Sequence, residues 1–163
     1  MTDRATKTPS EPIGPLQQRA IEIDVAQAFL SVLEGRLGAD RARVLFQEAV
    51  DCLAASAADG LRERYPDPTL ADLWEIWQFL GGDDRLDLHL DELTTQRLRF
   101  HVDGCAYADL YRSRGQEKIG VAFSCRRDAP FAKALIPAVD VEQSTTILEG
   151  SSRCEFTYTL EDE

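Results

Sequence analysis

The spacing of hydrophobic residues changes part-way along the chain. From Gln17 to Leu80, apolar residues recur every three or four positions, which is typical of helices with one buried face. Between Leu86 and Val102, apolar and polar residues alternate, which is typical of strands with one buried face. The pattern therefore predicts helices first and a β-sheet afterwards.

Three helices are predicted in the first part. The first begins near Gln17, and N-caps at Asp40 and Thr69 begin the other two, while glycines at positions 38, 60 and 81 end them. Because aromatic residues at helical spacing belong more often to a core than to a ligand pocket, Trp74 and Trp77 are predicted core residues. The predicted inward positions are Val25, Phe29, Leu33 and Leu37, then Val44, Leu45, Ala49, Leu53 and Ala57, then Leu70, Leu73, Ile76, Trp77 and Leu80.

The second part predicts two hairpins that enclose a helical insertion. The first hairpin turns within Glu92–Gln96, and helices are expected at about 105–114 and 117–127, with a further turn between Pro130 and Pro137. A third strand runs from Val139 to about Leu148. The inward side of the last strand is predicted to be Cys154, Phe156, Tyr158 and Leu160.

This order of elements predicts an α+β fold, in which N-terminal helices pack on one face of an antiparallel sheet of about four strands. Residues 17–163 form one domain of a size that buries a substantial core. Residues 1–16, with three prolines and many small polar residues, are predicted to be a flexible tail.

The net charge of −11 disfavours nucleic acid and anionic membrane surfaces as partners, because both require clustered Lys and Arg. No apolar stretch approaches the roughly 20 residues that span a bilayer, and no signal core follows the N-terminus. We therefore expect a cytoplasmic protein with reduced thiols and a small-molecule partner, and leave open whether it forms a homo-oligomer.

Three of the four cysteines lie after position 98, each beside polar groups. Cys105 follows His101 and Asp103, Cys125 precedes Asp128 by three residues, and Cys154 lies between Arg153 and Glu155. Their separations of 20 and 29 residues fit no zinc-binding pattern. The chemistry of this set therefore depends on whether the fold brings them together.

Three interpretations of the cysteines remain open. Cys105 at a helix N-terminus would have a lowered pKa and act as a thiolate nucleophile, with Asp109 or Asp128 as general acid and base and His101 as the nearby imidazole. Alternatively, the three thiolates would bind zinc with His101 or Asp128 as fourth ligand. In the third interpretation they are buried small hydrophobic residues.

Other familiar sites are missing from the sequence. There is no Gly-x-Ser-x-Gly, no phosphate-binding glycine loop, no His-Glu-x-x-His and no Cys-x-x-Cys. The chain has only two histidines, His89 and His101, so a multi-histidine metal site is excluded.

Three motifs resemble a known family in their order and spacing over about residues 98–158. They are Phe100-x-Val102-x-x-Cys105-x-Tyr107-Ala108-Asp109, Ser124-Cys125-x-x-Asp128, and Thr146-Ile147-x-Glu149-Gly150-x-x-x-Cys154-Glu155-Phe156. Together they are similar to the L-2-amino-thiazoline-4-carboxylic acid hydrolase family.

The resemblance implies a hydrolase that opens a 2-amino-thiazoline or related cyclic amidine ring. By position, it implies that the catalytic residues are Cys105, Cys125, Asp128 and Cys154. Substrate binding would fall to His101, Asp109 and Arg153. No cofactor is required, with zinc as the alternative stated above. The competing hypotheses are a non-catalytic, sensor-like domain that binds a small molecule or a metal, and a fold that has lost its chemistry.

Overall fold

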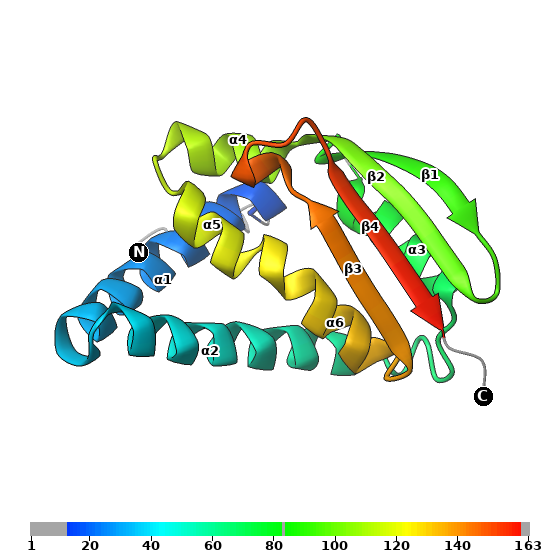
Figure 1. The fold of residues 1–163 in the computed structure, drawn as a ribbon, viewed down its shortest axis with the longest axis horizontal. Coiled ribbons are helices and arrows are strands. Elements are labelled where there is room, and N and C mark those ends of the chain that lie inside the picture. Colours follow the sequence, from blue (N-terminus) through cyan, green and yellow to red (C-terminus); the bar gives the residue numbers. More distant parts are fainter. Residues whose placement is uncertain (1–12, 83, 161–163) are drawn as a thin grey trace, which may run out of the picture.

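The computed structural model describes residues 13–82 and 84–160. Three helices come first, followed by a sheet that is interrupted by a helical insertion (Figure 1). The elements are α1 (Pro15–Leu37), α2 (Ala39–Asp59), α3 (Leu70–Gly81), β1 (Leu86–Leu93), β2 (Arg97–Cys105), α4 (Ala106–Ser113), α5 (Glu117–Phe123), the 3₁₀ helix η1 (Cys125–Arg127), α6 (Asp128–Leu135), β3 (Val139–Thr145), the 3₁₀ helix η2 (Ile147–Glu149) and β4 (Cys154–Leu160).

The ends of the first three helices follow from local chemistry. α1 begins at Pro15, within the predicted tail, because the fixed φ of proline suits the first turn of a helix. Gly38 separates α1 from α2 with a φ of 80°, which favours glycine, so Asp40 lies inside α2 and not at its cap. Thr69 caps α3 as predicted, in a reciprocal capping box with Asp72. Residues 1–12 of the predicted tail lie outside the described residues.

The predicted inward faces of α1 and α2 are wrong. In α2, Val44 is 58% exposed and Leu53 is 51% exposed, and in α1 Phe29 is 67% exposed. Apolar residues occur on more than one side of each helix, so periodicity alone could not identify the buried side. The residues that are buried in these two helices are Ile23 in α1 and Ala42, Phe46, Val50, Ala54 and Ala58 in α2.

The predicted fold class is confirmed. The four strands form one antiparallel sheet in the order β1-β2-β4-β3, and helices cover one of its faces (Figure 1). Trp74 and Trp77 of α3 pack on this inner face, with ring centroids 5.3 and 5.1 Å from that of Phe100. The buried residues of the two central strands are Leu98, Phe100, Val102, Cys154, Phe156 and Tyr158.

The helical insertion is more broken than the sequence predicted. The helix expected to continue to Arg127 ends at Phe123, and β3 ends at Thr145, before the turn η2. Gly120 permits α5 to pack against α4, because a Cβ there would lie 2.5 Å from Cδ2 of Tyr111. Among the described residues, no helix is long and apolar enough to cross a membrane. The cytoplasmic location stays a prediction.

Candidate functional site

A cavity of about 130 Å³ lies between the inner face of the sheet and the helical insertion. An empty cavity of roughly this size, about 150 Å³ and lined by apolar residues, is large enough to bind benzene. Its lining side chains come from α1, α3, α4, η1, the start of α6, η2 and the sheet. The lining residues important for its chemistry are Arg19, Cys105, Cys125, Arg127, Asp128 and Cys154.

Two of the cysteines are fixed at the ends of the central strands. Cys105 ends β2 and caps α4, where its sulfur accepts a hydrogen bond from the Ala108 amide at 3.4 Å. Cys154 begins β4, and its sulfur accepts a hydrogen bond from the Ile147 amide at 3.2 Å. These bonds direct both thiols to the same end of the sheet, on the face covered by helices.

The break after α5 positions the third cysteine and the aspartate. Cys125 begins η1 immediately after Ser124, and Asp128 begins α6. Asp128 and the thiols of Cys105 and Cys154 all act electrostatically on the Cys125 thiol, which shows that the four groups are neighbours. The fold thus brings together four residues, of which the first, Cys105, and the last, Cys154, are 49 positions apart in the sequence.

Asp128 has an unusual electrostatic environment. Removal from water raises the pKa of its carboxyl group from 3.8 to about 7, although the guanidinium groups of Arg127 and Arg19 act in the opposite direction. Near neutral pH, this group therefore exists in both protonation states. A carboxyl group with such a pKa can accept a proton and return it within one reaction cycle.

The thiols have pKa values shifted in the opposite sense from the sequence prediction. Burial raises the pKa of Cys105, and the hydrogen bond from the α4 N-terminus and the nearby Tyr107 amide only partly offset it. Burial likewise raises the pKa of Cys154 to about 11, and raises that of Cys125 further. The expectation of a lowered pKa at Cys105 is wrong, because desolvation and the neighbouring carboxylates outweigh the helix terminus.

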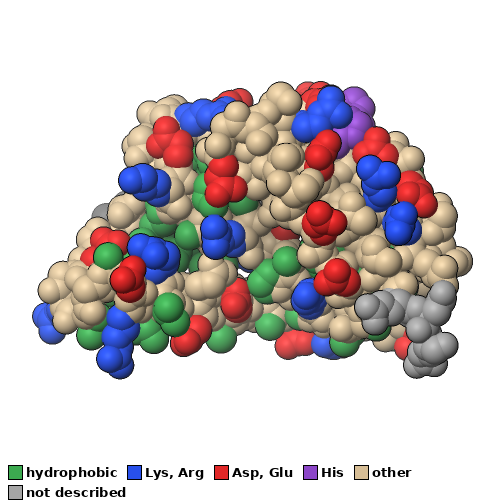
Figure 2. Space-filling model, viewed as in Figure 1, with side chains coloured by type: hydrophobic (Ala, Val, Ile, Leu, Met, Phe, Trp, Pro, Cys, Tyr) green, Lys and Arg blue, Asp and Glu red, His purple; other side chains and the backbone are tan. Residues whose placement is uncertain are grey.

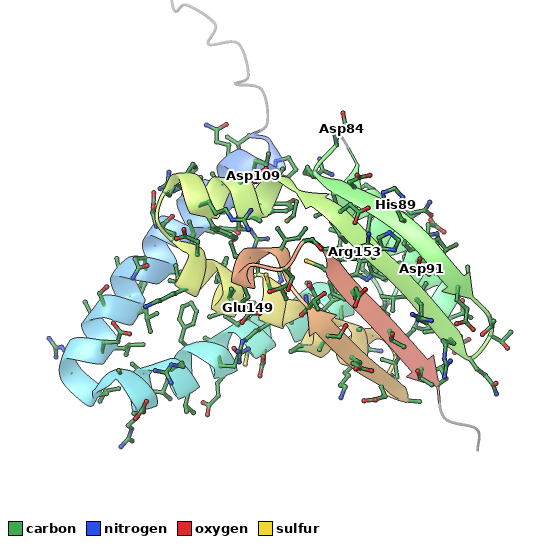
Figure 3. All side chains as sticks on the ribbon, turned by 45° about the horizontal axis from the view of Figure 1, so that its top comes forward. Asp84, His89, Asp91, Asp109, Glu149 and Arg153 are labelled. Carbon is green, nitrogen blue, oxygen red and sulfur yellow. The ribbon has the colours of Figure 1, made fainter. Side chains whose placement is uncertain are left out.

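Three predicted substrate-binding residues lie away from the cavity. His101 is on the outer face of the sheet, stacked on His89 with ring centroids 5.1 Å apart and hydrogen-bonded to Asp91 at 2.9 Å. Arg153 forms an ion pair at 3.3 Å with Asp103 on the same face. Figure 3 shows His89, Asp91 and Arg153 over the strands.

Asp109 also points away from the cavity. Its side chain on α4 is 79% exposed and pairs loosely with Arg112 at 3.8 Å. It still acts at a distance, because its charge contributes to the raised pKa of Cys105. Figure 3 shows it on α4.

The geometry of the described residues does not support the zinc-binding interpretation. Within residues 13–82 and 84–160, no group of three or more His, Cys, Asp or Glu side chains is arranged to hold a metal ion. His101 cannot complete a site with the three thiols, because the sheet itself separates its imidazole from them.

A sequence model of the L-2-amino-thiazoline-4-carboxylic acid hydrolase family matches residues 18–158. The chain belongs to this family. No protein of curated function matches the sequence. The match extends beyond the motifs near the cysteines to α1 and α2, which contribute Arg19 and the helical layer.

Among solved structures, two proteins are similar to this chain in fold. The chain resembles the phenol-responsive sensory domain of the transcription activator PoxR, with a TM-score of 0.53 at 12% identity, over 85% of this chain and 73% of that one. An Fe(II) unliganded H-NOX protein from K. algicida is also similar, with a TM-score of 0.38 at 9% identity, over 86% of this chain and 97% of that one.

Sequence reasoning missed the two arginines of the site. The Arg19 guanidinium lies 5.2 Å from the ring centroid of Phe123 and donates a hydrogen bond to Ser124 at 3.1 Å. Arg127 forms no hydrogen bond or ion pair within the described residues, and burial beside Arg19 lowers its pKa. The only sequence signal was the Cys125-Arg126-Arg127-Asp128 run, which does not say which arginine points inward.

A second hollow of about 280 Å³ adjoins the first and shares Trp77, Leu80, Arg127 and Asp128 with it. Arg64 and Tyr65 line its far side, where both contact Glu75 at 2.8 and 3.1 Å. Asp128 therefore lies where the two spaces meet.

Proposed function

We propose that this protein hydrolyses a small cyclic amidine that carries a carboxylate, of the 2-amino-thiazoline-4-carboxylate type. The observation that carries the proposal is the location of Asp128, with a pKa of about 7, in one cavity with Arg127 and three thiols. Membership of a family named for this hydrolysis supports the choice of substrate.

The reaction consumes one water molecule. Ionised Asp128 removes a proton from water as the water oxygen bonds to C2, the carbon between the ring sulfur and the nitrogens. The C2–S bond then breaks, and Asp128 returns the proton to the departing sulfur. The remaining hydroxyl proton on the C2 oxygen moves to the ring nitrogen, which gives the carbonyl and N–H of the urea. The product is an N-carbamoyl cysteine with a free thiol, so the atoms balance and Asp128 ends in its starting state.

The arginines bind the substrate carboxylate. Arg127 is half-buried, lacks an anionic hydrogen-bond partner among the described residues, and lines the cavity with Arg19. A half-buried guanidinium without an anionic partner binds an anionic ligand favourably, because the charge-assisted hydrogen bond replaces the hydration that burial removed. This role moves to Arg127 and Arg19 from Arg153, which pairs with Asp103 outside the cavity.

The three cysteines form the wall beside the reacting sulfur as neutral thiols. Their raised pKa values leave little thiolate at neutral pH, so water and not Cys105 is the proposed nucleophile. Soft, polarisable sulfur groups suit a sulfur-containing ring.

The test is turnover of 2-amino-thiazoline-4-carboxylate, followed by mass spectrometry of the N-carbamoyl cysteine product. Asp128→Asn should reduce kcat/KM by at least about 100-fold, the size of a lost acid–base catalyst. Cys105→Ala should stay within about tenfold of the native rate, since removal of a neutral wall residue costs far less than removal of a catalytic group. Loss of turnover in Cys105→Ala with retention in Asp128→Asn would replace the water mechanism with a thiol nucleophile.

A second candidate is a non-catalytic domain that binds a small molecule as a sensor. The likeness in fold to the PoxR sensory domain favours it, and the same cavity would hold the ligand. This candidate predicts that calorimetry detects binding of a small carboxylate or a phenol while no product forms. Turnover that depends on Asp128 would contradict it.

A further inference from the structure

The outer side of α1 is apolar and uncovered. Ile21, Val25, Phe29 and Val32 share one face of this helix at spacings of four, four and three residues, and each is more than half exposed. The opposite side packs into the molecule through Ile23, and through Ala26 and Leu30 at the edge of the core. α1 therefore presents apolar residues on two sides, and its own chain covers only one of them.

The uncovered side is part of a larger hydrophobic surface. Figure 2 shows hydrophobic side chains at the surface over α1 and α2, and Val44 and Leu45 of α2 are among the exposed ones. Contiguous surfaces of this kind on folded proteins mark places where another molecule binds. Phe29, at 67% exposed, contributes the largest apolar side chain of α1 to it.

The sequence of α1 indicates what covers its apolar side. Apolar residues occur at equal distances before and after Phe29 along the helix. Four residues to either side are Val25 and Leu33, and eight residues to either side are Ile21 and Leu37. Charges of opposite sign occur seven residues to either side, at Glu22 and Arg36. Positions seven apart lie on the same face of a helix, so this pattern belongs to the exposed stripe.

We propose that α1 pairs with α1 of a second copy of this chain, antiparallel, about a two-fold axis near Phe29. In that arrangement residues equally far from Phe29 face each other, so apolar residues meet apolar residues. Glu22 of each copy meets Arg36 of the other, and both ion pairs form at once because the interface is self-complementary. Arg36 has no ion pair within its own chain among the described residues. Glu22 pairs with Arg19 through Oε2 at 3.3 Å and keeps part of its carboxylate exposed toward the stripe.

The interface is at the small end of those that hold stable dimers. The stripe from Ile21 to Leu37 is about 24 Å long, and a pair of such helices buries less than the roughly 800 Å² per partner of a standard interface unless neighbouring residues join in. We therefore expect a dimer that dissociates on dilution through the micromolar range.

The test is sedimentation velocity of the full chain over a dilution series. The native protein should dimerise, and Phe29→Asp should be monomeric throughout, because it places two unpaired carboxylates at the axis. Phe79→Asp is the matched control: it changes an exposed phenylalanine of α3, outside this hydrophobic surface, and should leave the dimer intact. Circular dichroism establishes that each variant is folded.

Charge reversal tests the antiparallel register directly. Glu22→Arg and Arg36→Glu should each weaken dimerisation at least about fivefold, and the double variant should restore it, because opposite charges meet again. A native protein that stays monomeric, a dimer indifferent to Phe29→Asp, or a double variant as weak as the single ones would overturn the proposal.

Discussion

The two faces of the sheet carry clusters of the same residue types with opposite surroundings. On the inner face, Asp128 and three thiols line a cavity, where they are half-buried or buried. On the outer face, His89 and His101 lie among carboxylates with partners already in place, and solvent reaches most of them. Residue type alone would favour the outer cluster as a catalytic site, because it holds both histidines of the chain.

The difference lies in what each cluster still lacks. The ion pairs outside satisfy His101 through Asp91 and Asp103 through Arg153, so these groups need no ligand. Inside the cavity, desolvation raises the pKa of Asp128. Arg127 has no anionic hydrogen-bond partner there within the described residues, and burial lowers its pKa. A substrate can supply the hydrogen bonds and the opposite charge that these two side chains lack. Groups with shifted pKa values in a cavity therefore mark functional sites.

The largest expected difference is in reaction rate, between the thiol at the surface and the three thiols of the cavity. Cys52 is exposed on α2, while the three cavity cysteines are partly or fully buried. With an aromatic disulfide reagent at pH 7.5, we expect one fast thiol and three slow ones, because burial raises the pKa of each cavity thiol. Cys154 should react at least about 100-fold more slowly than the fast thiol, since a rise of its pKa to about 11 reduces the thiolate by about that factor. Cys52→Ser should remove the fast phase. A fast thiol that persists in Cys52→Ser would show that a cavity cysteine is activated.

The paired arginines of the Cys125–Asp128 run allow a matched comparison. Arg127→Gln should weaken binding of a carboxylate ligand by about 10- to 100-fold, the size of a lost charge-assisted hydrogen bond. Arg126→Gln should leave affinity within twofold, because Arg126 is exposed and does not line the cavity. Titration calorimetry measures both. Equal losses would mean that Arg127 acts only through net charge, and no loss in either would place the anion elsewhere.

The outer cluster should matter least. His101→Gln and Asp103→Asn are each expected to change turnover less than twofold, since neither side chain reaches the cavity. Their effect on unfolding free energy should stay near 1 kcal/mol or below, as for exposed ion pairs. A larger loss of turnover in His101→Gln, with KM unchanged, would mean that the two faces are coupled.

The sequence predicted the sheet well because each central strand has one clear inward side. Alternation placed Phe100 and Val102 inside and His101 outside, and the same rule turned Cys154 inward beside Phe156. It left open whether the three thiols come together, because Cys105 and Cys125 were predicted in helices and not in strands. It could not identify Arg127, because the sequence predicted one helix over 117–127, whereas α5 ends at Phe123 and Arg127 lies in the short 3₁₀ helix η1.

The helical faces were harder for a physical reason. α1 has apolar residues on two of its sides, so the stripe of Val25 and Phe29 was as regular as the buried side at Ile23. If α1 pairs with a second copy, both sides are buried in the dimer and the ambiguity has a cause. The pKa values of the thiols could not be predicted from Gly104 and Cys105 alone, because burial depends on contacts with η1 and η2.

The central claim is that Asp128 is a buried carboxyl group with a pKa near 7. This pKa lies above the value of about 3.8 expected in the unfolded chain. Below about pH 4 the carboxyl group is neutral in both states, and between about pH 4 and pH 7 it ionises only in the unfolded chain. The free energy of unfolding therefore falls over this range and stays constant above it. Asp128→Asn cannot ionise and keeps that stability.

Denaturant unfolding of both proteins between pH 4 and pH 8 is therefore the most direct measurement. The account predicts that Asp128→Asn gains stability relative to the native protein by a few kcal/mol, on the order of 2–4, as pH rises to 7, with no further gain above that. Two stability curves that stay parallel across this range would contradict it, since Asp128 would then be an ordinary solvated aspartate.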